Sequence, residues 1–182
     1  MRHTQQLKRL LARRAAVTIP GAANALFARV IEDQGFEAVY VTGAGIANMS
    51  LGVPDLGLTT LPEVASQVAA MADAVALPLI VDADTGFGNA VNMVRTIRTL
   101  ERAGAAGIQI EDQVFPKKCG HFAGKTVIPP DEMVQKIKAA VDSRRDQDLQ
   151  IIARTDAAAV EGIEAAIARA HAFIEAGADA TF

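Results

Sequence analysis

Three stretches of the sequence repeat one pattern, and this repeat limits the fold more than any other feature. Each has a glycine that ends a helical pattern, two intervening residues and the start of an apolar run, at residues 35–38, 104–107 and 177–180. The glycines lie 69 and 73 residues apart (104 − 35 and 177 − 104), which is room for two strand–helix units per interval. Such alternation predicts an α/β protein with parallel strands joined by right-handed crossovers.

Apolar runs and helical periodicity place the individual elements. The predicted strands are residues 15–19, 38–42, 79–84, 107–111, 150–155 and 180–182. The predicted helices are residues 4–14, 22–34, 61–75, 89–103, 132–144 and 161–176, with a turn at Pro20 and Gly21. The chain is 51% hydrophobic but only 4% aromatic, as expected for helices laid over buried parallel strands.

This alternation fits either a (β/α)₈ barrel or an open doubly wound sheet. The glycine pattern at residues 43–45 lacks the third glycine of a dinucleotide-binding turn. Polar residues end nearly every strand, and a barrel collects its strand ends around one mouth. We therefore expect residues 1–182 to form a single (β/α)₈ TIM-type barrel domain. A barrel needs eight strands and about 250 residues, so we expect it to be truncated within strand six.

Charge and cysteine content argue against several classes of protein. The net charge is only −3, and no block of basic residues suggests nucleic-acid binding. One cysteine cannot form an internal disulfide, which suits a reducing compartment. The N-terminus lacks the apolar stretch of a signal peptide, and no apolar run is long enough for a bilayer. We expect a soluble cytoplasmic protein with no membrane partner.

Acidic residues at strand ends are the candidates for metal binding. Asp82 and Asp84 are two residues apart on one strand, so they face the same side. Two carboxylates facing the same side repel unless a cation lies beside them, and Mg²⁺ takes one or two carboxylates. The alternative is that they cap the following helix. Glu111 could join the same site, whereas Asp112 would point the other way. Asp55, taken alone, suits a turn.

Two further strand ends suggest anion binding. Thr42, Gly43 and Ala44 offer small side chains and open backbone N–H groups to a carboxylate or phosphate. A plain tight turn is the equal alternative. Arg154 ends an apolar strand, where a guanidinium needs an anion. That anion could be a substrate carboxylate or the acidic partner of a structural ion pair.

The loop at residues 117–125 (K-K-C-G-H-F-A-G-K) holds the single cysteine. A buried cysteine is usually a small hydrophobe, but Cys119 has Lys117, Lys118 and His121 close by in the sequence. Neighbouring cations favour the thiolate, so this thiol could donate and accept protons near neutral pH. His121 could orient the thiol or bind a carboxylate. The spacing is not a zinc site, because no other ligands complete it.

The sequence resembles the isocitrate lyase and phosphoenolpyruvate mutase superfamily. Four segments carry the resemblance: residues 40–45 (Y-V-T-G-A-G), 54–58 (P-D-L-G-L), 81–88 (V-D-A-D-T-G-F-G) and 110–121 (I-E-D-Q-V-F-P-K-K-C-G-H). Within the last, K-K-C-G-H resembles the signature of the lyase branch. The resemblance implies a (β/α)₈ barrel, a homotetramer that exchanges a C-terminal helix, and Mg²⁺ as the cofactor, with Mn²⁺ as a substitute. It implies that the metal is held by Asp84, with Asp55, Asp82 and Glu111 helping directly or through water.

The same resemblance implies how substrate is bound and converted. The carboxylate and oxo group of a 2-oxo acid would be bound by Thr42, Gly43, Ala44, Gly120 and Arg154. The catalytic residues would be Cys119 as the acid–base group on a gating loop, with Tyr40, Lys118 and His121 assisting. The partner would be a small carboxylate substrate.

The expected reaction is Mg²⁺-dependent carbon–carbon cleavage. A 2-hydroxy di- or tricarboxylate of the methylisocitrate or 2,3-dimethylmalate type would yield a 2-oxo acid and a carboxylate. Phe115 and Pro116, with residues 122–125, favour the dimethylmalate lyase and oxaloacetate hydrolase side of the branch. Hydrolysis of oxaloacetate to oxalate and acetate is therefore one alternative, and a non-catalytic truncated barrel fragment is another.

Overall fold

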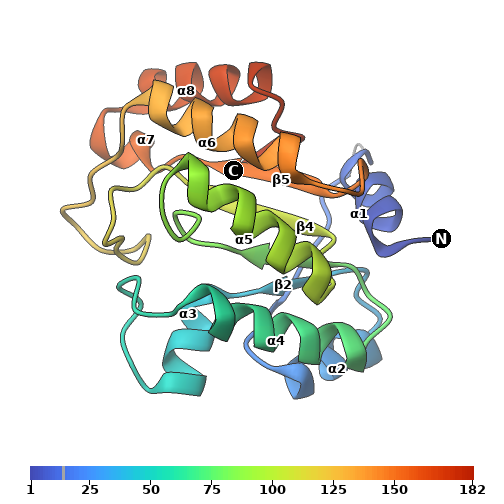
Figure 1. Cartoon of the computed structure of the whole chain (residues 1–182). Helices are drawn as coiled ribbons and strands as arrows, with labels where there is room; N and C mark the ends of the chain where they lie inside the picture. Colours follow the sequence, from blue (N-terminus) through green and yellow to red (C-terminus); the bar gives the residue numbers. More distant parts are fainter. Residues whose placement is uncertain (14) are drawn as a thin grey trace.

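The computed structural model describes residues 1–13 and 15–182. Its strands form a six-stranded parallel sheet in chain order, with helices in the connections (Figure 1). The strands are β1 (Gly21–Ala22), β2 (Val39–Val41), β3 (Leu79–Asp82), β4 (Gly107–Glu111), β5 (Gln150–Arg154) and β6 (Ala180–Thr181). The helices are α1 (His3–Leu11), α2 (Ala25–Asp33), α3 (Gly43–Ile46), the π-helix η1 (Ala47–Leu51), α4 (Leu61–Ala74), α5 (Ala90–Ala103), α6 (Pro130–Ser143), α7 (Ala157–Val160) and α8 (Ile163–Glu175).

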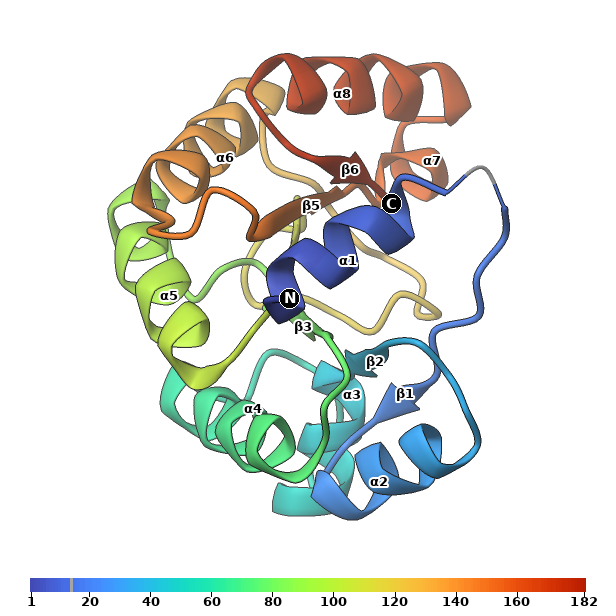
Figure 2. The same ribbon diagram turned by 90° about the vertical axis from the view of Figure 1, so that its right-hand side faces the viewer.

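The strand order separates the two architectures that the sequence left open. A doubly wound sheet reverses its order at a switch point, whereas here every strand pairs with the next one in the chain. Sequential parallel strands are the arrangement of a β/α barrel. Figure 2 shows them curving together inside an outer layer of α2, α4, α5, α6 and α8. Across the described residues β1 and β6 are the sheet edges, so the structure shows an arc of the barrel type, and closure stays a prediction.

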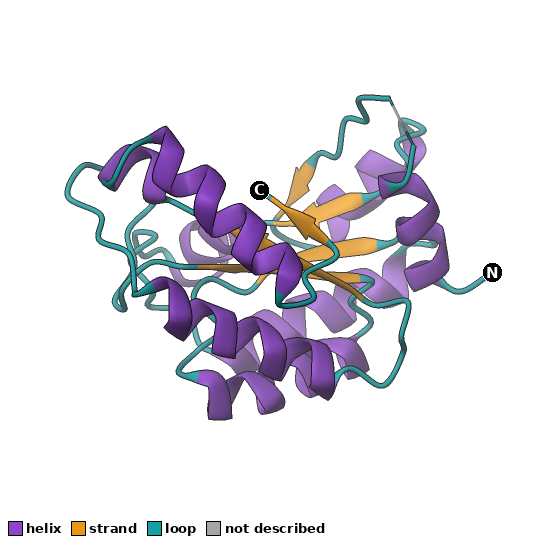
Figure 3. Ribbon diagram, turned by 90° about the horizontal axis from the view of Figure 1, so that it is seen from above, coloured by secondary structure: helices purple, strands orange, loops and turns teal. Residues whose placement is uncertain are grey.

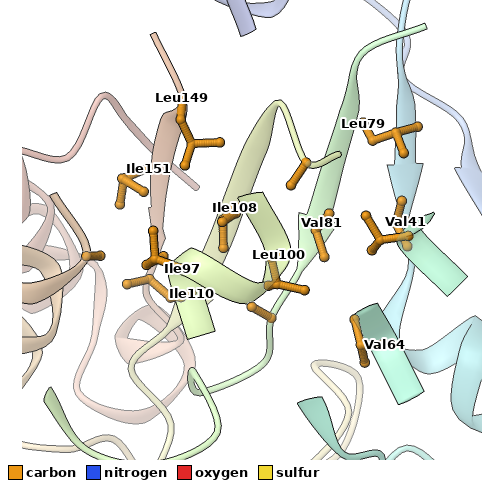
Figure 4. Close-up of a cluster of buried hydrophobic side chains, with 14 of the residues drawn as sticks. Val41, Val64, Leu79, Val81, Ile97, Leu100, Ile108, Ile110, Leu149 and Ile151 are labelled. Atoms are coloured by element: carbon orange, nitrogen blue, oxygen red, sulfur yellow. The ribbon is translucent and has the colours of Figure 1, made fainter. Parts of the chain in front are cut away.

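The outer face of the sheet packs against the helices. Alternate strand residues, among them Val41, Val81, Ile108 and Ile151, contribute to one buried apolar cluster. Leu100 of α5 belongs to the same cluster, which Figure 4 shows between strands and helices. Figure 3 shows the helices along the outside of the strands. Burying this surface on one side of every strand stabilises the α/β layers.

The inner face changes character along the strands. At their N-terminal ends, Leu7 and Leu10 of α1 pack against Ala38, Ile80 and Ile152, and Figure 2 shows α1 lying inside the arc. Farther along the same face come the polar side chains of Tyr40, Asp82, Gln109, Glu111 and Arg154. The register supports this, since Asp82 pairs with Gln109, and Glu111 with Arg154. Apolar side chains therefore fill one end of the concave face, and ionisable side chains line the other end.

The repeated glycines take the conformation that their positions require. Gly35, Gly104 and Gly177 have φ angles of 80°, 106° and 104°, in the left-handed region that favours glycine at a helix C-terminus. The backbone then turns into β2, β4 and β6. The pattern that predicted the α/β fold therefore corresponds to three equivalent helix-to-strand turns.

Several predicted boundaries are wrong. The first strand is not residues 15–19: pairing begins at Pro20, whose carbonyl accepts from Tyr40 N at 2.9 Å, so the expected turn leads into β1. Val17 and Ile19 are apolar because they pack against the inner cluster. The helix expected from residue 22 starts at Ala25, since the Asn24 side chain accepts from Phe27 N.

Other elements differ in length. The helix predicted for residues 161–176 corresponds to α8, which begins after Gly162, whose φ is 97°. The short helix α7, which precedes Gly162, was not predicted. The short helices α3 and η1 were not predicted at all. The helix expected to reach Arg14 ends at Leu11, and Arg14 lies outside the described residues. None of the described helices is long and apolar enough to span a membrane.

Candidate active site

A buried lysine links Asp55, in the loop after η1, to Asp84, just after the end of β3. Lys117 forms ion pairs with Asp55 and with Asp84, and its Nζ lies 2.8 Å from Asp84 Oδ1. The three side chains are only 5%, 11% and 8% exposed, in that order. Burial alone would lower the pKa of Lys117, but the charges of Asp84 and Asp55 outweigh it and raise the pKa. The ammonium therefore stays charged between two carboxylates.

Asp82 and Asp84 lie together, as the sequence predicted. The backbone N–H of Asp84 donates to Asp82 Oδ1 at 3.2 Å. A Cβ on Gly43 would lie 3.2 Å from Asp82 Oδ2 and 3.4 Å from Asp84 Oδ1, so a glycine lets the backbone approach both carboxylates. Asp84 also has a φ of 48°, a strained conformation for a residue with a Cβ, of the kind that clusters at functional sites.

The raised pKa values of two acids in this site indicate that its positive charge does not balance its carboxylates. Burial, reinforced by the charge of Asp82, raises the pKa of Asp84 to about 6 although Lys117 opposes the shift. Glu111 is 2% exposed, and burial raises its pKa to about 8 despite the opposing charge of Arg154. Arg154 Nη1 is 3.5 Å from Glu111 Oε2, and Arg154 Nη2 is 3.2 Å from Asp156 Oδ1. The cations present do not fully compensate the buried carboxylates.

The carboxylates fit a hard divalent cation that needs few protein ligands. Asp84 Oδ1 and Glu111 Oε1 are buried without a hydrogen-bond partner, although the former lies close to Lys117. Among the described residues, no three or more His, Cys, Asp or Glu side chains are grouped as a metal centre. Mg²⁺ is satisfied by one or two carboxylates plus water and substrate oxygens. The pair Asp82 and Asp84 suits that requirement, with Glu111 and Asp55 nearby.

The cysteine loop folds over the strand ends. A Cβ on Gly120 would lie 2.6 Å from Arg154 Nη2, so this glycine contacts the guanidinium directly. Lys125 Nζ donates to the Gly120 carbonyl at 2.6 Å and to Asp156 Oδ1 at 2.8 Å. Cys119 is half-buried. It directly precedes Gly120, which contacts Arg154.

Gln113 anchors the other side of this loop. Its Oε1 accepts from Lys118 N at 3.0 Å, and its Nε2 donates to the Lys118 carbonyl at 3.0 Å. The same Nε2 donates to Asp156 Oδ2 at 3.2 Å. Asp156 thus connects Gln113, Lys125 and Arg154, which ties the loop to the end of β5.

The predicted site residues do not all lie together in the structure. The Lys118 ammonium points within its own loop and donates to the Gly124 carbonyl at 2.8 Å, and His121 is exposed. Thr42 accepts from Gly45 N at 3.2 Å and so caps α3; Ala44 lies in the same turn.

Tyr40 is on the inner face of β2, where burial and the charge of Asp82 raise its pKa. The phenol therefore holds its proton at neutral pH.

Two alternatives from the sequence can be judged. The side chains of Asp82 and Asp84 do not cap the helix that follows, because Asn89 accepts from Val91 N and Asn92 N at the start of α5. Asp112 is fully buried and accepts from Thr155 Oγ1 at 2.7 Å and from Asp156 N at 2.9 Å. Its role is structural, as its position beside Glu111 suggested.

The sequence interpretation missed four residues of the site. Lys117 and Lys125 are buried by ion pairs that the chain makes with distant residues, and Gln113 and Asp156 hold the loop. Lys117 and Lys118 look equivalent in the sequence, although one is buried and the other exposed. The one available signal was Asp156, a carboxylate directly after a predicted strand.

Comparison with known proteins adds independent information. Residues 7–182 match a family model described as phosphoenolpyruvate phosphomutase. The chain is 50% identical over 182 residues to a 2,3-dimethylmalate lyase of Eubacterium barkeri, covering 100% of this chain and 63% of the relative. It is 55% identical over 176 residues to a 2-methylisocitrate lyase of Aeropyrum pernix, covering 97% of this chain and 56% of the relative. The chain thus spans about 60% of the length of these relatives.

Solved structures agree with this result. A crystal structure of 2,3-dimethylmalate lyase, described as a PEP mutase/isocitrate lyase superfamily member, matches with a TM-score of 0.94 and 39% identity over 100% of this chain and 62% of that one. An oxaloacetate acetylhydrolase with 3,3-difluorooxalacetate matches at 0.94 and 38%, over 98% and 62%. A phosphonopyruvate hydrolase with oxalate and Mg²⁺ matches at 0.88 and 36%, over 100% and 62%. The chain therefore belongs to the phosphoenolpyruvate phosphomutase family, within the PEP mutase/isocitrate lyase superfamily.

Proposed function

We propose that this chain provides the catalytic strand ends and cysteine loop of a Mg²⁺-dependent carbon–carbon lyase. The substrate would be a 2-hydroxy di- or tricarboxylate of the 2,3-dimethylmalate or methylisocitrate type. The observation that carries the proposal is a pair of under-compensated buried carboxylates: Asp84, which pairs with Lys117 of the cysteine loop, and Glu111, which lies beside Arg154. The relatives named as dimethylmalate and methylisocitrate lyases support it.

The strand ends would bind the 2-oxo acid portion of the substrate. Asp84 would hold the metal, with Asp55, Asp82 and Glu111 helping directly or through water. When bound, Mg²⁺ would polarise the 2-hydroxy group and offset the negative charge of the carboxylate beside it. Arg154 would pair with that carboxylate through its guanidinium. Thr42, Gly43, Ala44 and Gly120 would leave room for the substrate close to the backbone.

The loop would supply the proton that completes cleavage. The substrate hydroxyl would pass its proton to solvent water, with Tyr40 positioning the group. The C–C bond then breaks, and its electron pair stays on the leaving carboxylate fragment as an aci-carboxylate. The Cys119 S–H protonates the carbon of that fragment and becomes a thiolate, which takes a proton from solvent water before the next turnover. Lys118 and His121 would stabilise the fragment's charge after a loop movement, because neither contacts the carboxylates in the present arrangement.

Turnover assays on the purified protein test this function. Methylisocitrate, 2,3-dimethylmalate and oxaloacetate would each be incubated with Mg²⁺, and products identified by ¹H NMR. We expect a 2-oxo acid from one of the first two substrates, and loss of turnover with EDTA or in Cys119→Ser. Ala123→Ser, in the same loop, serves as the matched control and should retain turnover. Full activity of Cys119→Ser, or activity independent of divalent metal, would refute the mechanism.

Oxaloacetate hydrolysis is the second candidate function. The similarity to the oxaloacetate acetylhydrolase structure supports it, as do Phe115 and Pro116 before the loop lysines. Release of oxalate and acetate from oxaloacetate, without cleavage of the two hydroxy acids, would select this reaction. No turnover of any of the three substrates would instead favour the non-catalytic fragment that needs other chains.

Assembly of the protein is proposed on the same grounds. The family resemblance suggests a homotetramer, and the sheet described here has β1 and β6 as its edges. Light scattering after size-exclusion chromatography would measure the mass of the species in solution. A mass of about four chains is expected for the full-length form, whereas a monodisperse monomer of that form would contradict the proposal.

A further inference from the structure

A cavity in the described residues is formed without the candidate metal ligands. Its volume is about 610 Å³, and it lies at the N-terminal turns of α4, α5 and α6, beside the loops that follow β3 and β4. Asp55, Asp82, Asp84 and Glu111 do not line it. A cavity of this size is in the range of small-molecule sites.

Lys136 is the unusual residue in this cavity. It lies on α6, lines the cavity, and is only 3% exposed. It forms neither a hydrogen bond nor an ion pair with any residue in the ranges 1–13 and 15–182. Burial lowers the pKa of Lys136, whereas the charges of Glu132, Glu111 and Asp112 oppose that shift without forming an ion pair with it. An anion bound in the cavity would therefore be a direct partner for the ammonium.

The charges around Lys136 define what such an anion would be. Arg95 of α5 also lines the cavity and pairs with no acid among the described side chains. Glu132, one turn before Lys136 on α6, is the acidic residue of the lining. Within the lining, these two cations and one carboxylate leave one net positive charge, while the buried Glu111 and Asp112 also act on Lys136. The cavity therefore suits a monoanion better than a multiply charged phosphate.

The rest of the lining is largely apolar. Leu58, Leu61, Phe87, Phe115 and Ile128 contribute side chains to it. Aromatic and aliphatic walls of this kind favour a ligand with an apolar body, while a few polar groups fix its orientation. The cavity also includes Gln113, the residue that holds the cysteine loop through Lys118.

We propose that this cavity is a binding site for a small monocarboxylate with an apolar body, whose carboxylate pairs with Lys136 and Arg95. The site is separate from the metal and substrate site proposed above. Its occupant would contact Gln113 and Phe115, which precede the cysteine loop in the chain. The proposal does not depend on the lyase reaction, and either one can fail alone.

Titration with 4-fluorobenzoate, followed by ¹⁹F NMR, tests this site in the wild-type protein. The neutral amide 4-fluorobenzamide has nearly the same shape and serves as the matched probe. We expect saturable binding of the acid and at least about tenfold weaker binding of the amide, since a charge-assisted contact is lost. Absence of saturable binding, or equal binding of acid and amide, would overturn the proposal.

Variants locate the bound acid. Lys136→Met should weaken 4-fluorobenzoate binding by about tenfold or more, whereas Lys138→Met, an exposed lysine on the same helix, should leave it unchanged. If Lys136→Met does not fold, the exposed Arg95→Gln carries the same prediction. Saturating oxalate with Mg²⁺, directed at the candidate active site, should not displace the probe. Displacement by oxalate, or unchanged affinity in both cavity variants, would refute a separate site.

Discussion

Lys117 Nζ lies 2.8 Å from Asp84 Oδ1 and at the same time pairs with Asp55, so one buried ammonium joins two carboxylates from different loops. Lys117 also begins the cysteine loop, two residues before Cys119. The position of that loop and the charge balance at the end of β3 are therefore linked. A rearrangement of the carboxylates, for example by a cation, would act on the loop through this residue.

Replacement of Lys117 by methionine should destabilise the protein. The change leaves Asp55 and Asp84 buried without their cation, and breaking a buried ion pair costs about 3–5 kcal/mol. We expect a loss near the lower end of that range, about 3 kcal/mol, because both carboxylates retain slight exposure. Urea unfolding in the absence of divalent metal measures it. Lys118→Met, at an exposed neighbouring position, is the control and should change the stability by less than about 0.5 kcal/mol.

Asp156 should make the protein sensitive to acid. Burial alone would raise its pKa, but the hydrogen bond from Lys125 and the charge of Arg154 outweigh it and hold the pKa below its usual range. Because this folded-state value lies below the unfolded value of about 3.9, the carboxylate stabilises the fold above that pH. The contribution is lost as the pH falls through the folded-state pKa.

Asp156→Asn tests this dependence. At pH 7 the variant should be less stable than wild type by about 2 kcal/mol, the range of a lost charge-assisted hydrogen bond, and the difference should shrink below about pH 4. Asp131→Asn, at an exposed site on α6, is the control. A stability difference that stays constant from pH 7 to pH 3 would show that the Asp156 charge has no such role.

Asp112 should be important for stability and not for metal binding. It is fully buried, and its Oδ2 lies 3.3 Å from Arg169 Nη1, in addition to its bonds with Thr155 and the Asp156 backbone. Asp112→Ala leaves the Arg169 guanidinium without this partner, so we expect a loss of about 3 kcal/mol. Thermal unfolding measures it, with Asp131→Ala as the control. A loss below about 1 kcal/mol would contradict the structural role.

Gly120 should control access to Cys119. A side chain at this position would lie 2.6 Å from Arg154 Nη2, so Gly120→Ala should displace the loop from the strand ends. The only cysteine in the chain then reports the change, and its reaction with a disulfide reagent such as DTNB should accelerate several-fold. Ala123→Ser, in the same loop, should react at the wild-type rate. An unchanged rate for Gly120→Ala would mean that the contact does not restrain the loop.

The regular core of the fold could be predicted from the sequence because its signals are local. The strand predicted for residues 107–111 matches β4, and the helix for 89–103 matches α5 with Asn89 as its cap. Each depends on apolar periodicity and on a neighbouring cap or glycine. The first strand was misplaced because an apolar run next to Pro20 packs under α1 instead of pairing.

The site was predicted only in part, for a different reason. Asp82 and Asp84 could be recognised because two residues on one strand share a face. Lys117 could not, since its partner Asp55 is 62 residues away in the chain. Lys136 looked like any surface lysine on an amphipathic helix, although α5 and the neighbouring loops bury it. Long-range packing decides such cases, and a local pattern carries no information about it.

The most direct test of the central claim is calorimetric titration of oxalate in the presence and absence of Mg²⁺. If Asp84 holds a cation beside Arg154, oxalate, which resembles the product end of a 2-oxo acid, should bind with Mg²⁺ and not with EDTA. Asp84→Asn should abolish that binding, while Asp131→Asn should retain it. Equal binding of oxalate with Mg²⁺ and with EDTA, or unchanged Mg²⁺-dependent binding in Asp84→Asn, would contradict the account.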